Sequence, residues 1–206
     1  MPTTPSEPAP LRPYRERWPE ILRYPLHPAA LSTIAAIAVA HLVDFLPGVG
    51  GLLDLVVWAA FFKYAFEVLR WTANGRSEPP EISFTVSDSI ATWAVLLLIA
   101  AEFLIAVIAS AYGAAIGFAL GVGLMLAMPA VMIALALEEE IAQALNPLAW
   151  LLLAERIGRS YFVLAGFFAT AVALQSVVAA WLSSMLPAFV AEPLVYAVVN
   201  YLMIAN

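Results

Sequence analysis

Long apolar tracts dominate this chain and restrict what it can fold into. Six of them approach the roughly 20 apolar residues that a helix needs to cross a bilayer. They lie near residues 29–46, 52–70, 90–111, 114–137, 161–186 and 188–205. Hydrophobic residues make up 64% of the chain, against roughly 45–50% in soluble domains. The sequence therefore predicts an all-α fold, a polytopic membrane helical bundle of about six transmembrane helices.

The placement of basic residues predicts how these helices are oriented. If the six tracts alternate across a bilayer, all nine Lys and Arg residues fall on the same side as the N-terminus. Loops rich in Lys and Arg stay in the cytoplasm. We therefore expect both termini to be cytoplasmic.

Two segments differ from the apolar tracts. Residues 1–28 are rich in proline and arginine, which predicts a disordered, basic cytoplasmic segment before a membrane domain at 29–206. Within that domain, Asn146 and Pro147 supply an N-cap and a first-turn proline for a short helix at about 147–158. This helix mixes apolar and charged residues, so we expect it to lie along the inner membrane surface.

The stretch HLVDFLPGVGGLLD, residues 41–54, places ionisable residues at the predicted outer end of the first hairpin. Asp54 is expected in the first turn of the second helix and Glu192 near the start of the sixth, where carboxylates cap exposed N–H groups. His41 lies three residues before Asp44 and shares its helix face. Two interpretations stay open for this outer acidic cluster: structural capping, or a site for a cation or a proton. The spacing matches no metal-binding motif.

A single carboxylate, Glu102, falls near the middle of the third tract. An ionised carboxylate there costs several kcal/mol, so it should be protonated or hydrogen-bonded to another helix. Gln175 and Ser176 in the fifth tract lie at comparable depth. A structural hydrogen bond and a proton-relay or substrate role are both consistent with this candidate intramembrane site.

Glycines repeat every four residues where the fourth tract begins, at Gly113, Gly117 and Gly121. Small residues at this spacing let helices approach closely and gain dispersion contacts that lipid cannot supply. The row predicts a helix-packing surface, within the chain or with another subunit.

Catalytic chemistry has little support in this sequence. There is no cysteine, which excludes disulfides, thiol nucleophiles and thiolate metal sites. No nucleophile-elbow, zinc-protease or Walker motif occurs. We expect neither enzymatic activity nor a cofactor, and the net charge of −6 argues against a nucleic-acid partner.

Two cytoplasmic stretches, KYAFEVLRWTANGRSEPPEI and ALNPLAWLLLAERIGRSYF, give the chain a family resemblance. The residues that carry it are Tyr64, Arg70, Asn74, Gly75, Pro79, Pro80, Asn146 and Pro147. The chain resembles a loosely defined group of uncharacterised bacterial multi-pass inner-membrane proteins and, more distantly, Yip-family proteins, which take part in membrane trafficking. The resemblance covers most of the membrane region and implies an inner-membrane location without a catalytic residue.

These observations favour a non-enzymatic inner-membrane protein that acts as an accessory, scaffold or lipid-interacting subunit. Its expected partners are the lipid bilayer and another membrane protein. The alternative is a small transporter or channel-like protein that uses its buried acidic residues for a cation, a proton or a lipid headgroup.

Overall fold

The computed structural model describes residues 18–76, 78–80 and 89–205, and all the regular structure within them is helical. The α-helices are α1 Trp18–Arg23, α2 Pro28–Ala40, α3 Gly50–Ala73, α4 Ser89–Tyr112, α5 Ala114–Ile133, α6 Ile141–Ala144, α7 Pro147–Ile157, α8 Arg159–Met185 and α9 Ala188–Ala205. Two 3₁₀ segments, η2 Tyr24–Leu26 and η3 His41–Phe45, adjoin α2, and a π-helical segment, η4 Ala134–Glu138, continues α5. The predicted all-α membrane fold is confirmed.

Five of these helical segments are long and apolar enough to cross a membrane. They are Pro28–Phe45, Ile90–Tyr112, Ala114–Glu138, Arg159–Met185 and Ala188–Ala205. The second predicted span also forms a helix, α3, but this helix carries Asp54, Lys63, Glu67 and Arg70 and is not among the five. The composition of the helices thus supports five spans, and α3 stands apart because of its charges.

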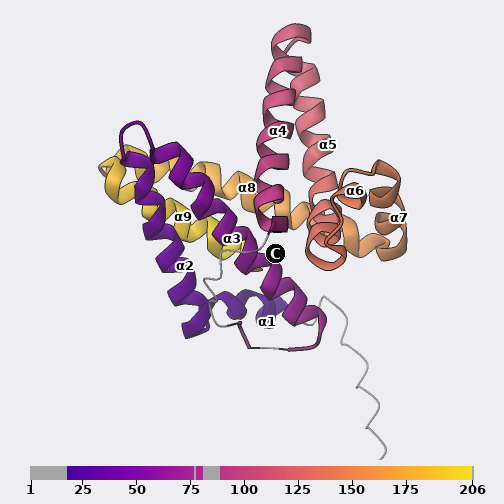
Figure 1. Ribbon diagram of the computed structural model, residues 1–206, viewed down its shortest axis with the longest axis horizontal. Coiled ribbons are helices and arrows are strands. Elements are labelled where there is room, and N and C mark those ends of the chain that lie inside the picture. The colour runs from indigo at the N-terminus through magenta and orange to yellow at the C-terminus, as the bar shows by residue number, and fades with distance from the viewer. Residues whose placement is uncertain (1–17, 77, 81–88, 206) are drawn as a thin grey trace, which may run out of the picture.

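Two regions of the molecule differ in how the helices associate (Figure 1). On one side, α2, α3 and α9 pack together, and α9 also pairs with α8. On the other, α4 and α5 form a hairpin that projects away from the remaining helices. Large apolar side chains on this hairpin are exposed, including Phe103 at 70% and Phe118 at 75%, which is consistent with lipid contact.

The core lies around α3. Phe61, Phe62 and Phe66 on this helix are buried, and they belong to a cluster that also includes residues of α2, the start of α4 and η4. Because α3 lies between the other elements, its buried apolar side chains pack against protein. The same position brings its charged residues next to other helices.

Arg70, near the end of α3, holds the π-helical end of α5. Its Nε donates to the carbonyl of Ala136 at 2.6 Å, and its guanidinium pairs with Glu139 at 2.8 Å. Glu139 adopts a left-handed conformation, φ 57°, and ends the π-helix. The three glutamates at 138–140 are exposed, as expected where a helix leaves the membrane.

The short helix after this exit forms as predicted. The Asn146 side chain accepts a hydrogen bond from the Leu148 N–H at 3.0 Å, and Pro147 is the first residue of α7. Leu148, Leu151 and Leu152 are each about two-thirds exposed, so α7 offers an apolar surface to its surroundings.

Residues 1–17 of the N-terminal segment, on which the predicted disorder rests, lie outside the described residues. Its later part belongs to the fold. Residues 18–26 form α1 and η2, Pro25 is buried, and the Tyr201 hydroxyl of α9 donates to the Leu22 carbonyl at 2.5 Å. The boundary at residue 28 therefore does not separate a segment without structure from the helical domain.

Candidate functional site

His41 lies at the centre of a polar site between η3, α3 and α9. Its side chain is 0% exposed, and its Nδ1 lies 2.5 Å from Oδ1 of Asp54, whose side chain is 15% exposed. Tyr196 of α9 stacks on the imidazole with 3.6 Å between ring centroids, and Trp58 of α3 meets it edge-on at 5.1 Å. An aromatic enclosure of this kind fixes the ring and keeps lipid away from it.

Glycines in the connecting turn allow this contact to form. Gly48 has a φ of +82°, which side-chain-bearing residues rarely adopt. A Cβ at Gly50 would lie 2.4 Å from the Asp44 carbonyl oxygen, so α3 can start this close to η3 only with glycine there. The turn folds α3 back along α2 and brings Asp54 beside His41.

The predicted capping role of the outer carboxylates is wrong. Helix α3 begins at Gly50 and α9 at Ala188, and neither has an acidic residue in its first turn. Asp54 and Glu192 lie one turn further in, where Asp54 hydrogen-bonds His41. The partner of Asp54 comes from the preceding element, which a helix-by-helix analysis could not identify.

The other two members of the predicted cluster are placed differently. Asp44 lies in η3 and is exposed, whereas Glu192 is partly buried and its Oε2 atom is enclosed without a hydrogen-bond partner. Within the described part of the chain, no three His, Asp or Glu residues are grouped so that they could hold a metal ion.

Three residues of this site were missed in the sequence. Trp58 and Tyr196 enclose the imidazole, and Asn200 is 0% exposed with no hydrogen-bond partner for either amide atom. A signal was available, since Glu192, Tyr196 and Asn200 follow one another at intervals of four and share one face of α9. On that polar face, Tyr196 contacts His41 of η3 and Trp58 of α3.

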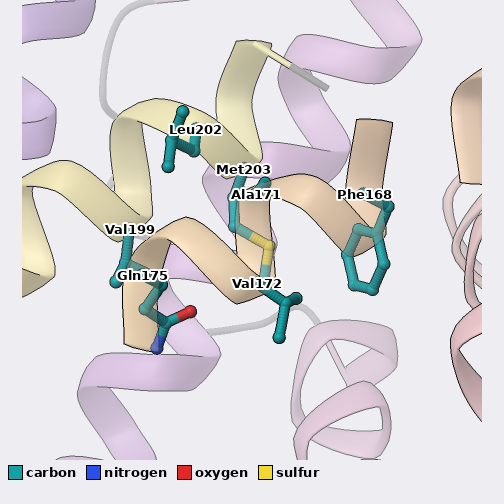
Figure 2. A pocket seen from close by; sticks show the side chains of 7 residues that line it. All are labelled: Phe168, Ala171, Val172, Gln175, Val199, Leu202 and Met203. Atoms are coloured by element: carbon teal, nitrogen blue, oxygen red, sulfur yellow. The ribbon is translucent and has the colours of Figure 1, made fainter. Parts of the chain in front are cut away.

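The predicted intramembrane site around Glu102 is dispersed. Glu102 is exposed on α4, while Gln175 lies in a small pocket between α8 and α9 to which α4 contributes no residue. Figure 2 shows Gln175 beside Val199 at one end of this pocket and Phe168 at the other. Ser176 is exposed, and its hydroxyl donates to the Val172 carbonyl of its own helix at 3.1 Å. A combined role of these residues has no geometric support.

The glycine row divides into positions with different surroundings. Gly117 is buried, and a Cβ there would lie 2.4 Å from the Cβ of Ala109 on α4. Gly113 adopts φ +102° between the two helices, and Gly121 has open space around it. The row therefore packs α5 against α4 at its beginning and leaves Gly121 uncovered.

Comparison with known proteins adds no relative: no protein-family model, curated protein or solved structure matches the chain. The resemblance to bacterial inner-membrane and Yip-family proteins stays a prediction.

Proposed function

We propose that this protein is a non-enzymatic accessory subunit that binds another membrane protein through its α4–α5 hairpin. The observation that carries this proposal is the position of Glu102, which is exposed near the middle of the Ile90–Tyr112 span. A carboxylate facing lipid at that depth is costly and is normally paired or enclosed. A partner helix would supply the enclosure that the chain itself does not.

Charge complementarity indicates what kind of partner fits. The sequence contains no Lys, Arg or His between Arg76 and Arg156, so neither helix of the hairpin offers a cation. A second copy docked through the same face would bring carboxylate to carboxylate. We therefore infer a different protein whose spanning helix carries a basic side chain or another hydrogen-bond donor at this depth.

The surface beside Glu102 suits close helix contact. Helices α4 and α5 are antiparallel neighbours, and Ala109 packs against Gly117. About two helical turns from that contact, Glu102 is level with the region of Gly121 and Gly123. A Cβ at either glycine would meet nothing within 4 Å, so a partner backbone can approach there.

The proposal includes a bacterial inner-membrane location with both termini in the cytoplasm, and α7 lying on the inner surface through its exposed leucines. This orientation requires α3 to span. Because the chain has no cysteine, single cysteines can test it. Gly51 has free space for a side chain and Glu78 is exposed beyond α3. Gly51→Cys and Glu78→Cys should label from opposite faces of intact vesicles, and labelling from one face would reject the six-span arrangement.

Docking is tested by crosslinking in the native membrane. A photoreactive amino acid at Phe103, next to Glu102, should crosslink to one membrane protein, and the same probe at Leu152 on α7 should not. The crosslinked peptide should come from an apolar helix with a basic or donor residue. Native mass spectrometry of complexes released in polymer discs should show a stoichiometric partner that Glu102→Gln removes and Glu155→Gln retains. Lipid crosslinks alone at Phe103 would reject the proposal.

A further inference from the structure

Five buried polar side chains share one region of the molecule. Tyr24, His41, Glu192 and Asn200 each bury a side-chain N or O atom that has no hydrogen-bond partner, and the buried Tyr64 hydroxyl lies beside Thr33 of α2. They belong to η2, η3, α3 and α9, and all four elements pack against α2. Buried polar groups are usually satisfied by protein or by internal water. Unsatisfied polar groups that are concentrated in one interface therefore indicate a shared role.

These residues are ordered along α2. Tyr196 of α9 stacks on His41 at one end of α2, and Tyr201 bonds to Leu22 near the other end, so α9 runs antiparallel to α2. Asn200, one turn after Tyr196, therefore lies further toward η2 than His41 does. Helix α2 has 13 residues, which corresponds to about 20 Å and covers most of a hydrocarbon core.

Two tyrosines, Tyr64 and Tyr24, form the end of this line of polar residues that lies furthest from His41. Helix α3 leaves the His41 site at Asp54 and reaches Tyr64 nearly three turns later. Tyr64 lies close enough to Tyr24 of η2 that it adds to burial in raising the pKa of Tyr24 to about 12. Tyr24 therefore stays a neutral hydroxyl at physiological pH and can both donate and accept a hydrogen bond.

We propose that the α2–α3–α9 interface conducts protons, with His41 as the group that takes up and releases them. With Nδ1 held by Asp54, the unpartnered Nε2 is the atom that binds the incoming proton. Besides Asp54, the groups that face His41 are Asp44 of η3 and Glu192 and Tyr196 of α9; the three carboxylates attract protons to this end.

Proton transfer through the line needs no other reactant. A proton bound at Nε2 leaves toward Asn200 and then toward Tyr64 and Tyr24, with water bridging the polar atoms, and is released at the η2 end. His41 then returns to its neutral form. The imidazole is suited to this role because each ring nitrogen can either hold or release a proton.

The test uses the full chain reconstituted in liposomes that contain a pH-sensitive dye. A potassium diffusion potential set with valinomycin should drive protons inward through the wild-type protein. His41→Phe keeps an aromatic ring beside Tyr196 and removes the proton acceptor, so the protein-dependent rate should fall at least tenfold. The other histidine gives a matched control. His27 is exposed and caps α2 through its side chain, and His27→Asn should leave the rate unchanged.

A second variant tests the path beyond His41. Asn200→Leu preserves approximate volume and removes the amide, and it should also lower the rate at least tenfold. It serves as the test if His41→Phe does not fold, as judged by circular dichroism and gel filtration. Glu102→Gln should conduct normally, which separates this proposal from the docking proposal. No flux above empty liposomes, or equal flux in wild type and both folded variants, would overturn the proposal.

Discussion

The α2–α3–α9 region and helix α4 differ in hydropathy and burial, whereas α5, the other half of the hairpin, is both apolar and buried, with a mean hydropathy of 2.4 and 39% of its span buried. The span in α4 has a mean hydropathy of 2.6 and is 11% buried within the chain, whereas the spans of α2 and α9 each have a mean hydropathy of 1.6 and are 28% buried. The most apolar of the five spans is thus the least buried one. The less apolar helices hold the buried polar residues.

The difference follows from the solvent. Lipid is as apolar as leucine, so an apolar side chain gains little by leaving it, and helices associate through close packing and polar contacts instead. Helices that carry His41, Asp54 or Asn200 must bury them against one another. Helix α4 carries one such residue, Glu102, which is exposed, and this exposure is the observation behind the proposed docking of another protein.

The largest expected effect comes from breaking the polar centre of the buried region. Asp54→Leu removes the partner of His41 Nδ1 and leaves a fully buried imidazole unsatisfied, so we expect the free energy of unfolding to fall by about 2–3 kcal/mol. The measurement is unfolding by SDS titration in micelles. Asp44→Asn, at an exposed position nearby, should change little; equal effects of the two variants would refute the distinction.

Core packing should give the next largest difference between the regions. Phe61 is 1% exposed and Phe118 is 75% exposed. Phe61→Ala should lower the free energy of unfolding by about 2 kcal/mol, because the cavity forfeits dispersion contacts although transfer from lipid counts little. Phe118→Ala should be neutral in thermal unfolding followed by circular dichroism. A loss of stability in Phe118→Ala would mean that the part of the hairpin around Phe118 also packs against protein.

Within the hairpin, substitutions at Gly117 and at Gly121 should differ in their effect on stability. A Cβ at Gly117 overlaps that of Ala109, so Gly117→Ala should push α4 from α5 and cost about 1–2 kcal/mol. Gly121→Ala meets open space and should unfold like the wild type. Thermal unfolding of the two proteins in the same detergent gives the comparison, and identical midpoints would show that the α4–α5 contact tolerates a methyl group.

The smallest expected effect concerns the link between α8 and α5. The Tyr161 hydroxyl donates to the Leu126 carbonyl at 2.6 Å, near Pro129 within α5. Tyr161→Phe removes this hydrogen bond and should cost about 1 kcal/mol. Faster amide exchange around residue 126 would report the local loosening. Tyr112→Phe is the control, since Tyr112 is 72% exposed at the hairpin tip; matching exchange rates in both variants would contradict a stabilising bond.

Several features of the fold were accessible from local sequence. The apolar tracts predicted all six long helices, because tract length and period depend only on neighbouring residues. Asn146 and Pro147 predicted the start of α7 for the same reason. Within residues 41–54, the structure places His41 beside Asp54. Capping had been inferred for Asp54 from its distance along the chain to an assumed helix start, and that inference was wrong.

The sequence by itself determined that this is a helical membrane protein, where its helices run, and which few polar residues need an explanation. The tertiary structure decided which of those residues meet: Asp54 with His41, Tyr196 over the imidazole, Arg70 with Glu139, and Glu102 outside the packed region. Helix formation is local, since its hydrogen bonds join residues four apart. The pairing of polar side chains depends on how helices distant in sequence pack against each other. Hydropathy does not predict this packing, because lipid and the protein interior are equally apolar.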